Sequence, residues 1–442
     1  MILFRNLMVV WVIGWTIVAY QQFSQSFQKN NILSNNWGFN TGLGLKLNIN
    51  NSWNISIGGR YQHFLTNFVN DNYSEVYTKN SEELRSSENY GMNFKLNKNF
   101  YSILIFSFFF SLIEYLRSMI FGGFPWNLIA YSFTDSLQLI QILSLIGTYS
   151  FNLLCITIFL IPSIIFFKYK KNKKILILLF SILLVMINYF YGTYSIKKYK
   201  ENDKTNLNFV IKIISPKIDI KRFFLNEAPE ESILELIRLS EPNRLENTVF
   251  VFPEGVLSNI YLQDLKNFSY LFSENFSEKH KIILGVSSKE NSKIFNSLVV
   301  IDKDTNILAK YDKNKLVPFG EYLPFENLLG NLGFKKITQG YQSFSSSNKR
   351  NIIKLDDISF LPLICYEVIY SGNINKNDKD FDFIINISED GWFGESVGPH
   401  QHFSHSIFRS IEEGKNLIRS ANNGISAHID ATGKIISKLK ST

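Results

Sequence analysis

Cysteine is scarce in this chain of 442 residues, where Cys155 and Cys365 are the only two. So few thiols exclude a disulfide framework and a four-cysteine zinc site, and each thiol has to be considered singly. Charged residues make up only 19% of the chain, apolar residues make up 45%, and the mean hydropathy is close to zero. This balance excludes both a disordered chain and a protein made only of membrane spans.

The net charge of +8 points to anionic partners, either nucleic acid or lipid headgroups. Lipid is favoured, because five lysines fall within residues 168–174, beside long apolar runs. The sequence therefore predicts a membrane as partner and no nucleic acid.

Three apolar runs are predicted to be transmembrane helices, at residues 100–121, 137–167 and 175–195. Glu114 and Arg117 lie three residues apart in the first run, and charges in hydrocarbon tend to pair. The lysine-rich loop 168–174 is predicted to be cytoplasmic by the positive-inside rule. The chain after residue 197 would then lie on the far side of the membrane.

Residues 1–99 differ from the rest of the chain. The apolar stretch 7–23 is either a signal-peptide core or a first membrane span. Apolar residues alternate from Trp37 to Ile49 and again from Trp53 to Tyr61, which predicts a β-hairpin, and residues 91–96 repeat the pattern briefly. A piece of an outer-membrane β-barrel and an ordinary exposed hairpin both fit.

This N-terminal segment conflicts with the predicted topology. If loop 168–174 is cytoplasmic, the two spans before it, 137–167 and 100–121, place residues 31–99 in the cytoplasm as well. Strands of an outer-membrane barrel have no barrel to join there. Local signals that disagree with the global architecture argue against one foldable unit. We therefore expect residues 1–99 to be a foreign segment, from a gene rearrangement or an assembly error, with a lineage-specific insertion as the alternative.

Residues 205–442 have the pattern of a soluble α/β domain, in which strands alternate with helices around a layered sheet. Strands are predicted at residues 208–214, 248–252, 281–286, 297–301, 358–366, 383–387, 416–420 and 426–429. Helices are predicted at residues 231–240 and 263–279 and around residues 400–414.

Three residues next to turns could carry chemistry together. Glu254 follows a buried strand, Lys313 precedes the run LVPFGEYLP (316–324), and Cys365 ends an apolar strand. A carboxylate can accept the thiol proton, a thiolate can attack an acyl carbon, and an ammonium can stabilise the oxyanion that forms. Taken singly, each has a plainer explanation as a solvated turn glutamate, a surface lysine or a buried cysteine.

The order Glu–Lys–Cys with these flanks resembles the nitrilase (carbon–nitrogen hydrolase) superfamily. Within it, several segments resemble the apolipoprotein N-acyltransferase family: LVPFGEYLP (316–324), ICYE (364–367), ISEDGWFG (387–394), GPHQHF (398–403) and RSANNGIS (419–426). Upstream, EYLR (114–117) and GFPW (123–126) resemble the late membrane helices of that family. The resemblance extends over about residues 103–435.

The resemblance implies an α/β fold, a nitrilase-like four-layer α-β-β-α sandwich preceded by transmembrane helices. It also implies that Glu254 is the general base and Cys365 the nucleophile. Lys313, rather than Lys315, has the spacing of the oxyanion-stabilising lysine. The supporting positions that it implies are Glu321, Tyr366, Glu367 and the loop aromatic Trp392.

The implied reaction is a two-step acyl transfer in the bacterial inner membrane, with the catalytic domain in the periplasm. A phospholipid would donate a fatty acyl chain to Cys365, and the α-amine of an S-diacylglyceryl-cysteine at the N-terminus of an apolipoprotein would accept it. The resemblance implies no cofactor and no metal. His400, His402 and His405 could suggest a metal cluster, but their spacing suits the start of a helix better.

Three features depart from the family, and two other readings stay open. Residues 1–99 do not resemble the early membrane helices of the family. Residues 215–223 lack the usual Gln-x-Asn strand end and tryptophan, and Phe223 is the candidate replacement for the tryptophan. The chain stops soon after Gly433, where the family continues into a last membrane helix, so we expect a C-terminally truncated catalytic domain. The alternatives are a membrane-tethered amidase of the same superfamily and an inactive, chimeric or incomplete family member.

Overall fold

The computed structural model divides the chain into two compact units, residues 1–102 and 103–442. It describes residues 37–50, 53–65, 99–120, 123–202, 208–223, 228–324, 343–355, 358–372, 374 and 380–439. The apolar stretch 7–23 and the short repeat at 91–96 lie outside these residues, so their predicted structures stay predictions.

Among its described residues, the first unit contains one antiparallel pair of strands, β1 (Trp37–Asn50) and β2 (Trp53–Leu65). Leu45 lies opposite Ile57, and the connection falls at residues 51–52. The pair coincides with the hairpin that the alternating pattern predicts. Whether it belongs to a barrel or is a plain exposed hairpin stays open.

Three described helical segments are long and apolar enough to cross a membrane: α4 (Phe100–Arg117), α6 with η4 (Leu143–Phe166) and α7 (Lys171–Glu201 of Lys171–Asn202). The first two lie in the predicted runs 100–121 and 137–167, and α7 contains the third run, 175–195, and extends beyond it at both ends. The run 137–167 is not one helix, because α5 (Leu137–Ile140) is separate and Gly147 has a φ of +72°. The predicted pairing of Glu114 with Arg117 is confirmed as an ion pair.

Helices α6 and α7 each contact the large α/β domain near one end, and the end of α4 contacts the chain that follows it. At the start of α6, the backbone N–H of Thr148 donates to Oε1 of Glu412 over 2.6 Å. Near the end of α7, the Tyr199 hydroxyl donates to Asn416 over 3.0 Å. At the end of α4, Arg117 donates to the carbonyl oxygen of Phe124 over 2.7 Å. The predicted lysine-rich loop 168–174 lies at the opposite ends of α6 and α7, and its last four residues form the start of α7 rather than a loop.

The α/β domain is built on two six-stranded sheets. The first has the order β3 (Val210–Ile213), β4 (Thr248–Val251), β6 (His280–Glu290), β7 (Lys293–Ile301) and β8 (Ile307–Asp312), with β5 (Leu257–Tyr261) paired to β6. The second has the order β14 (Ile435–Lys438), β13 (Ala427–Ile429), β12 (Asn416–Asn422), β11 (Phe383–Glu389), β10 (Ile358–Ile364) and β9 (Ile353–Leu355).

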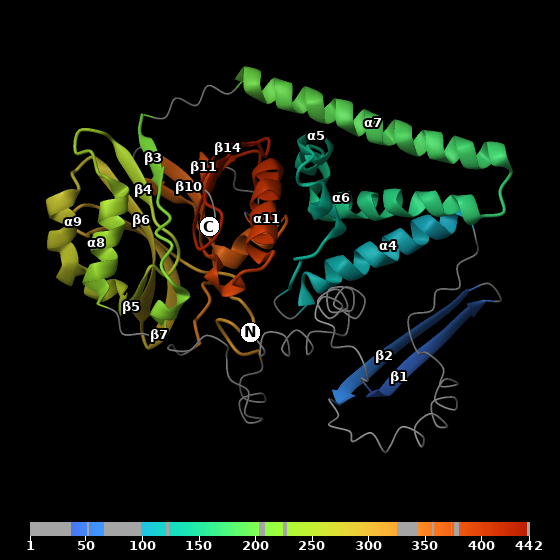
Figure 1. Cartoon of the computed structure of the whole chain (residues 1–442), viewed down its shortest axis with the longest axis horizontal. Coiled ribbons are helices and arrows are strands. Elements are labelled where there is room, and N and C mark those ends of the chain that lie inside the picture. The colour runs from blue at the N-terminus through green and yellow to red at the C-terminus, as the bar shows by residue number, and fades with distance from the viewer. Residues whose placement is uncertain are drawn as a thin grey trace, which may run out of the picture. The chain divides into compact units, whose positions relative to one another are not determined.

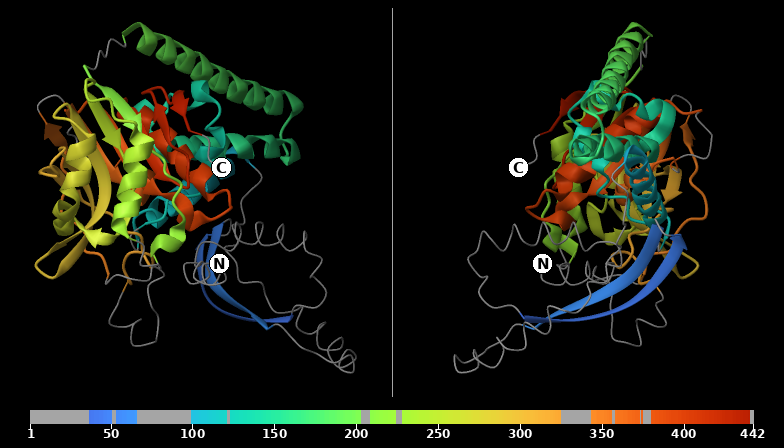
Figure 2. Two further views of the ribbon diagram at one scale, coloured as in Figure 1. Left: turned by 60° about the vertical axis from the view of Figure 1, so that its left-hand side comes forward. Right: turned by 90° about the vertical axis from the view of Figure 1, so that its right-hand side faces the viewer.

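Apolar cores on both sides of each sheet produce four layers (Figure 1). Helices α8 (Pro229–Ser240) and α9 (Ser269–Asn275) cover the first sheet, and α11 (Gly398–Glu413) covers the second. A third core, which includes Ile283 and Phe360, fills the space between the sheets. The predicted α-β-β-α sandwich is confirmed, and Figure 2 shows it from two further sides with α7 in green at the edge of this unit.

Two predicted elements end earlier than expected. The predicted helix 263–279 is a 3₁₀ helix, η6 (Leu262–Phe268), followed by α9, because Phe276 turns into the core and β6 begins at His280. The predicted strand 358–366 stops at Ile364, because Cys365 adopts a φ of +49° and begins η7 (Cys365–Ile369). Strands β5, β8, β9 and β14 were not predicted, since they are short and lack continuous apolar runs.

Candidate active site

The three proposed catalytic side chains all follow the ends of strands. Glu254 comes three residues after β4, Lys313 directly after β8, and Cys365 directly after β10. Gly285 in β6 lets the chain at Glu254 come close, because a Cβ at this glycine would lie 2.6 Å from the Cα of Glu254. The backbone N–H of Lys313 donates to the carbonyl oxygen of Asn296 in β7 over 2.8 Å.

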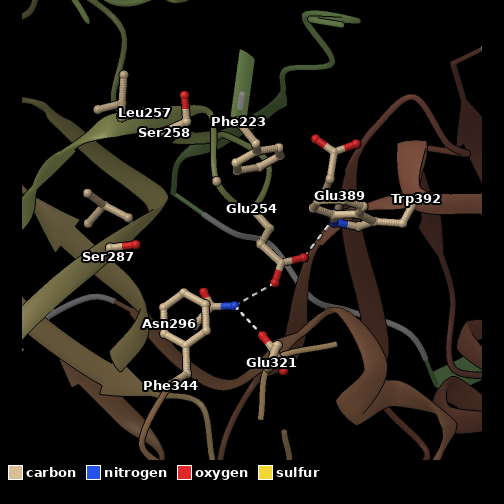
Figure 3. Close-up of a pocket in the computed structure, with 12 residues that line it drawn as sticks. Phe223, Glu254, Leu257, Ser258, Ser287, Asn296, Glu321, Phe344, Glu389 and Trp392 are labelled. Atoms are coloured by element: carbon tan, nitrogen blue, oxygen red, sulfur yellow. Dashed lines mark hydrogen bonds between the residues drawn. The ribbon is translucent and has the colours of Figure 1, made fainter. Parts of the chain in front are cut away.

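Glu254, Lys313 and Glu321 form one buried charged group. The Lys313 Nζ lies 2.9 Å from Oε1 of Glu321 and 3.4 Å from Oε1 of Glu254. The side-chain amide of Asn296 donates to the same two oxygens, over 2.9 Å and 2.7 Å (Figure 3). The second oxygen of Glu254 accepts the backbone N–H of Glu389, which brings in the second sheet. Both carboxylates are thus held in fixed orientations.

Lys313 is a cation in this setting. Burial lowers its pKa, but the charges of Glu254 and Glu321 outweigh burial and hold the pKa well above its ordinary value. Lys315, in contrast, has an exposed side chain whose ammonium lies 5.9 Å from the ring centre of Tyr370. Of the two lysines considered from the sequence, the structure brings Lys313 to Glu254.

Cys365 is the first residue of η7, and its backbone has a left-handed conformation. Burial raises the pKa of the thiol above its ordinary range, the charge of Glu254 raises it further, and Lys313 opposes both. At neutral pH the sulfur therefore carries its proton. Attack by this sulfur requires a base. Of the two carboxylates that raise its pKa, Glu254 has the larger effect, and Asp390 is paired with Arg419.

Glu367 connects the cysteine turn to the loop after Lys313. Its Oε2 accepts the N–H of Ile364 over 2.9 Å, and its Oε1 accepts the N–H groups of Asn314 and Lys315 over 2.9 and 3.0 Å. Arg350 donates to the same Oε1 over 2.8 Å. Although burial acts in the opposite direction, Arg350 and these hydrogen bonds hold the Glu367 pKa below its usual value. This carboxylate therefore fixes the backbone of these loops, and it is not available as a general acid or base.

Tyr366 connects the cysteine turn to the chain that follows α4. Its hydroxyl donates to the carbonyl oxygen of Gly123, and its ring stacks on Phe124 with 6.0 Å between centres. Because Arg117 binds the carbonyl of Phe124, the end of α4 is linked to the residue next to Cys365 through two contacts.

Trp392 and Phe223 form the aromatic wall of a cavity beside Glu254 (Figure 3). Their rings stack with 5.3 Å between centres, and the Arg222 guanidinium lies 4.4 Å from the centre of the Phe223 ring. Arg222 in turn forms a buried ion pair with Glu389. Phe223, the candidate replacement for the family tryptophan, therefore lines the same cavity as Glu254 and Trp392.

The histidines of α11 do not form a shared ligand set. His402 contacts Asp390 over 2.9 Å, and His405 packs against the rings of Trp126 and Tyr131. Within the residues that the structure describes, no group of three or more His, Cys, Asp or Glu side chains is arranged to hold a metal ion. Cys155 packs in the apolar core under the second sheet.

Sequence reasoning missed several residues of the site. Asn296, Arg222 and Glu389 contact the charged group or the cavity wall, and no role was predicted for them. A usable signal was their position: Glu389 follows the apolar strand 383–387, and Asn296 precedes the apolar strand 297–301. Polar residues at the ends of buried strands are candidates for a site.

Comparisons with known proteins agree with this arrangement. The family model described as carbon–nitrogen hydrolase matches residues 269–442, and the one described as apolipoprotein N-acyltransferase N-terminal domain matches residues 90–161. The chain is 34% identical over 362 residues to an apolipoprotein N-acyltransferase of Rickettsia prowazekii, covering 80% of this chain and 71% of that protein. It is 32% identical over 350 residues to one of Rhizobium rhizogenes, covering 76% and 65%.

Proposed function

Because the chain belongs to the apolipoprotein N-acyltransferase family, we propose that it transfers a fatty acyl chain from a membrane phospholipid to a lipoprotein. The acceptor is the α-amine of an S-diacylglyceryl-cysteine at the N-terminus. The single observation that carries the proposal is the contact of Lys313 with Glu254 and Glu321 beside the Cys365 turn.

In the first step, Glu254 accepts the thiol proton and the sulfur of Cys365 attacks the ester carbonyl of the phospholipid. The Lys313 ammonium stabilises the negative charge that develops on the carbonyl oxygen, in a buried setting where such charge stabilisation is strong. Collapse of the tetrahedral intermediate breaks the ester bond. The lysophospholipid oxygen takes the proton from Glu254, and a thioester remains on Cys365.

In the second step, the lipoprotein amine attacks the thioester carbonyl. Glu254 removes the proton from the attacking nitrogen, the C–S bond breaks, and the proton returns to the sulfur. The products are an amide and free Cys365. A thioester suits this order because it stores the acyl group in a form that an amine can attack.

The membrane helices fit a catalytic domain on the periplasmic side of the inner membrane. Thr148 of α6 and Tyr199 of α7 contact the α/β domain, and Arg117 of α4 binds the carbonyl of Phe124, whose ring packs on Tyr366. The lysine-rich segment lies at the other ends of α6 and α7. With that loop in the cytoplasm, the α/β domain lies outside it. Phe223 and Trp392 are proposed to contact the acyl chain next to the reacting carbonyl.

The first test is mass spectrometry of the purified protein after incubation with phospholipid that carries a deuterated acyl chain. We expect a hydroxylamine-sensitive acyl mass on Cys365, and none in Cys365→Ala. An adduct that persists in Cys365→Ala would overturn the assignment of the nucleophile.

The second test adds a peptide with an N-terminal S-diacylglyceryl-cysteine to the acylated protein. We expect the label to move to the α-amine, and a peptide with an acetylated N-terminus to stay unlabelled. Loss of the thioester to water at the same rate with and without peptide would support the amidase alternative. A protein that never acquires the label would support the inactive alternative.

A further inference from the structure

The backbone at Cys365 needs an external constraint. Its φ of +49° lies in the left-handed region, which residues with a Cβ avoid. Such conformations persist where the surrounding structure holds them, and they gather at active sites. The question is which contact holds this residue and what that contact does for the thiol.

The carbonyl oxygen of Cys365 is bound by His402. The Nε2 atom of this buried histidine lies 3.2 Å from that oxygen. A carbonyl oxygen only accepts hydrogen bonds, so Nε2 must carry the hydrogen. His402 comes from α11, which covers the outer face of the second sheet, and thus reaches the cysteine turn from the side opposite to the first sheet.

The other edge of the His402 ring is fixed by charged groups. Its Nδ1 lies 3.0 Å from Nη2 of Arg419 and 2.9 Å from Oδ1 of Asp390. Arg419 also donates to both oxygens of Asp390, and all three side chains are fully buried. Burial and the charge of Arg419 lower the pKa of His402 and outweigh Asp390, which raises it, so a neutral ring with hydrogen on Nε2 is favoured. Arg419 then donates to Nδ1 and also pairs with the charge of Asp390 beside it.

The hydrogen bond from His402 fixes more than one atom. A peptide group is planar, so the C=O of Cys365 and the N–H of Tyr366 lie on opposite edges of one rigid unit. A change of φ at Cys365 would swing its Cβ and its carbonyl group together about the N–Cα bond, so a contact that holds the carbonyl oxygen also holds the thiol in place.

We propose that His402 is a positioning residue for acyl transfer, which holds the Cys365–Tyr366 peptide so that the thiol keeps one orientation toward Glu254 and Lys313. The proposal rests on the proposed function for the identity of the reaction. It assigns to His402 no proton transfer and no contact with substrate.

The test compares two substitutions that differ in which ring nitrogen they replace. The amide nitrogen of Gln reaches close to the place of Nε2, so His402→Gln keeps a donor for the Cys365 carbonyl. The shorter Asn reaches only the place of Nδ1, so His402→Asn removes that donor. His405→Asn is the matched control, because His405 is equally buried in the same helix and packs against Trp126 and Tyr131 instead.

Two acyl donors are used, deuterated phospholipid and the small ester p-nitrophenyl butyrate, and the unfolding midpoint of each variant is recorded. Misplacement of a reacting group costs on the order of 100-fold in rate. We expect His402→Asn to lower the maximal acylation rate by about that factor with KM nearly unchanged, while His402→Gln stays within about tenfold of wild type. His405→Asn should keep the wild-type acylation rate even if its unfolding midpoint changes.

Equal rates for His402→Gln and His402→Asn, or a wild-type rate for His402→Asn, would overturn the positioning role. A wild-type protein that reacts with the small ester but takes nothing from phospholipid would overturn the proposed function and leave the comparison of variants valid. A wild-type protein that reacts with neither donor would overturn both.

Discussion

Glu254 and Lys313 lie in a group of side chains that bind one another, whereas Cys365 is held through the peptide groups around it. On the first side, carboxylates, an ammonium and the amide of Asn296 are joined by contacts of 2.7–3.4 Å. On the second side, His402 binds the carbonyl of Cys365, and Glu367 binds the N–H groups of neighbouring residues.

This difference in how the residues are held indicates that the charged group and the contacts around Cys365 do different work. The charged group determines protonation and stabilises the charges that change during the reaction, so its members should be sensitive to substitutions that keep shape but remove charge. The cysteine side determines geometry, so its members should be sensitive to the loss of a particular donor or acceptor and should affect the stability of the fold.

The largest effect is expected for Glu254→Gln, which keeps the shape of the side chain and removes the base. General base catalysis contributes typically 10²–10⁴-fold, so formation of the thioester should slow by about that factor. Single-turnover acylation measures it, and the unfolding midpoint should stay near that of the wild type. If Glu254→Gln acylates at the normal rate, another group is the base and the charged group loses its assigned task.

Lys313→Met should slow acylation by about 100- to 1000-fold, the usual range for the loss of one oxyanion stabiliser. Lys315→Met is the control on the same loop, because its side chain is exposed and lies away from Glu254. It should change the rate by less than about threefold, since exposed charges have small effects. The reverse ranking of the two variants would show that the wrong lysine has been assigned.

Glu367→Gln tests the other side of the comparison. It breaks the buried ion pair between Glu367 and Arg350, and breaking a buried ion pair costs about 3–5 kcal/mol of unfolding free energy. Glu235→Gln, which breaks the exposed pair with Arg238, should cost no more than about 1 kcal/mol. Equal costs for the two variants would contradict a special role for the Glu367 contacts.

The contribution of Glu367 to the unfolding free energy depends on pH in a defined direction. Because the folded protein lowers the Glu367 pKa, its stabilising effect is complete above the unfolded pKa of about 4.3 and is lost as the pH falls through the folded value. The difference in unfolding free energy between wild type and Glu367→Gln should therefore be full at pH 7 and should shrink in acid. A difference that grows in acid would contradict the direction of the pKa shift.

The sequence predicted the catalytic residues themselves better than the contacts that orient them. Glu254 and Cys365 could be placed because each follows an apolar run that predicts a strand, whereas Lys313 was assigned by its spacing to LVPFGEYLP (316–324), since β8 has no continuous apolar run. The contacts that orient them could not be placed, because they depend on the register between distant segments. Arg222 and Glu389 are 167 residues apart, and the hydrogen bond from His402 depends on a turn at Cys365 that the pattern assigned to a strand.

The smallest effect is expected for Asn296→Ala, which tests whether the charged group needs its neutral member. The amide of Asn296 donates to Glu254 and to Glu321, and hydrogen bonds to charged groups contribute about 1.5–3 kcal/mol each. Because Lys313 still binds both carboxylates, part of their orientation survives, and we expect acylation to slow only about tenfold. The backbone carbonyl that accepts the N–H of Lys313 is unchanged by this substitution.

Asn306→Ala is the control, because its amide donates to Asp302 over 2.9 Å in an exposed turn of the same sheet. It should leave the acylation rate unchanged. A loss for Asn296→Ala as large as that for Glu254→Gln would mean that the carboxylates depend on Asn296 for their orientation. The charged side would then be held by a neutral donor, as the cysteine side is held by His402, and the contrast between the two sides would disappear.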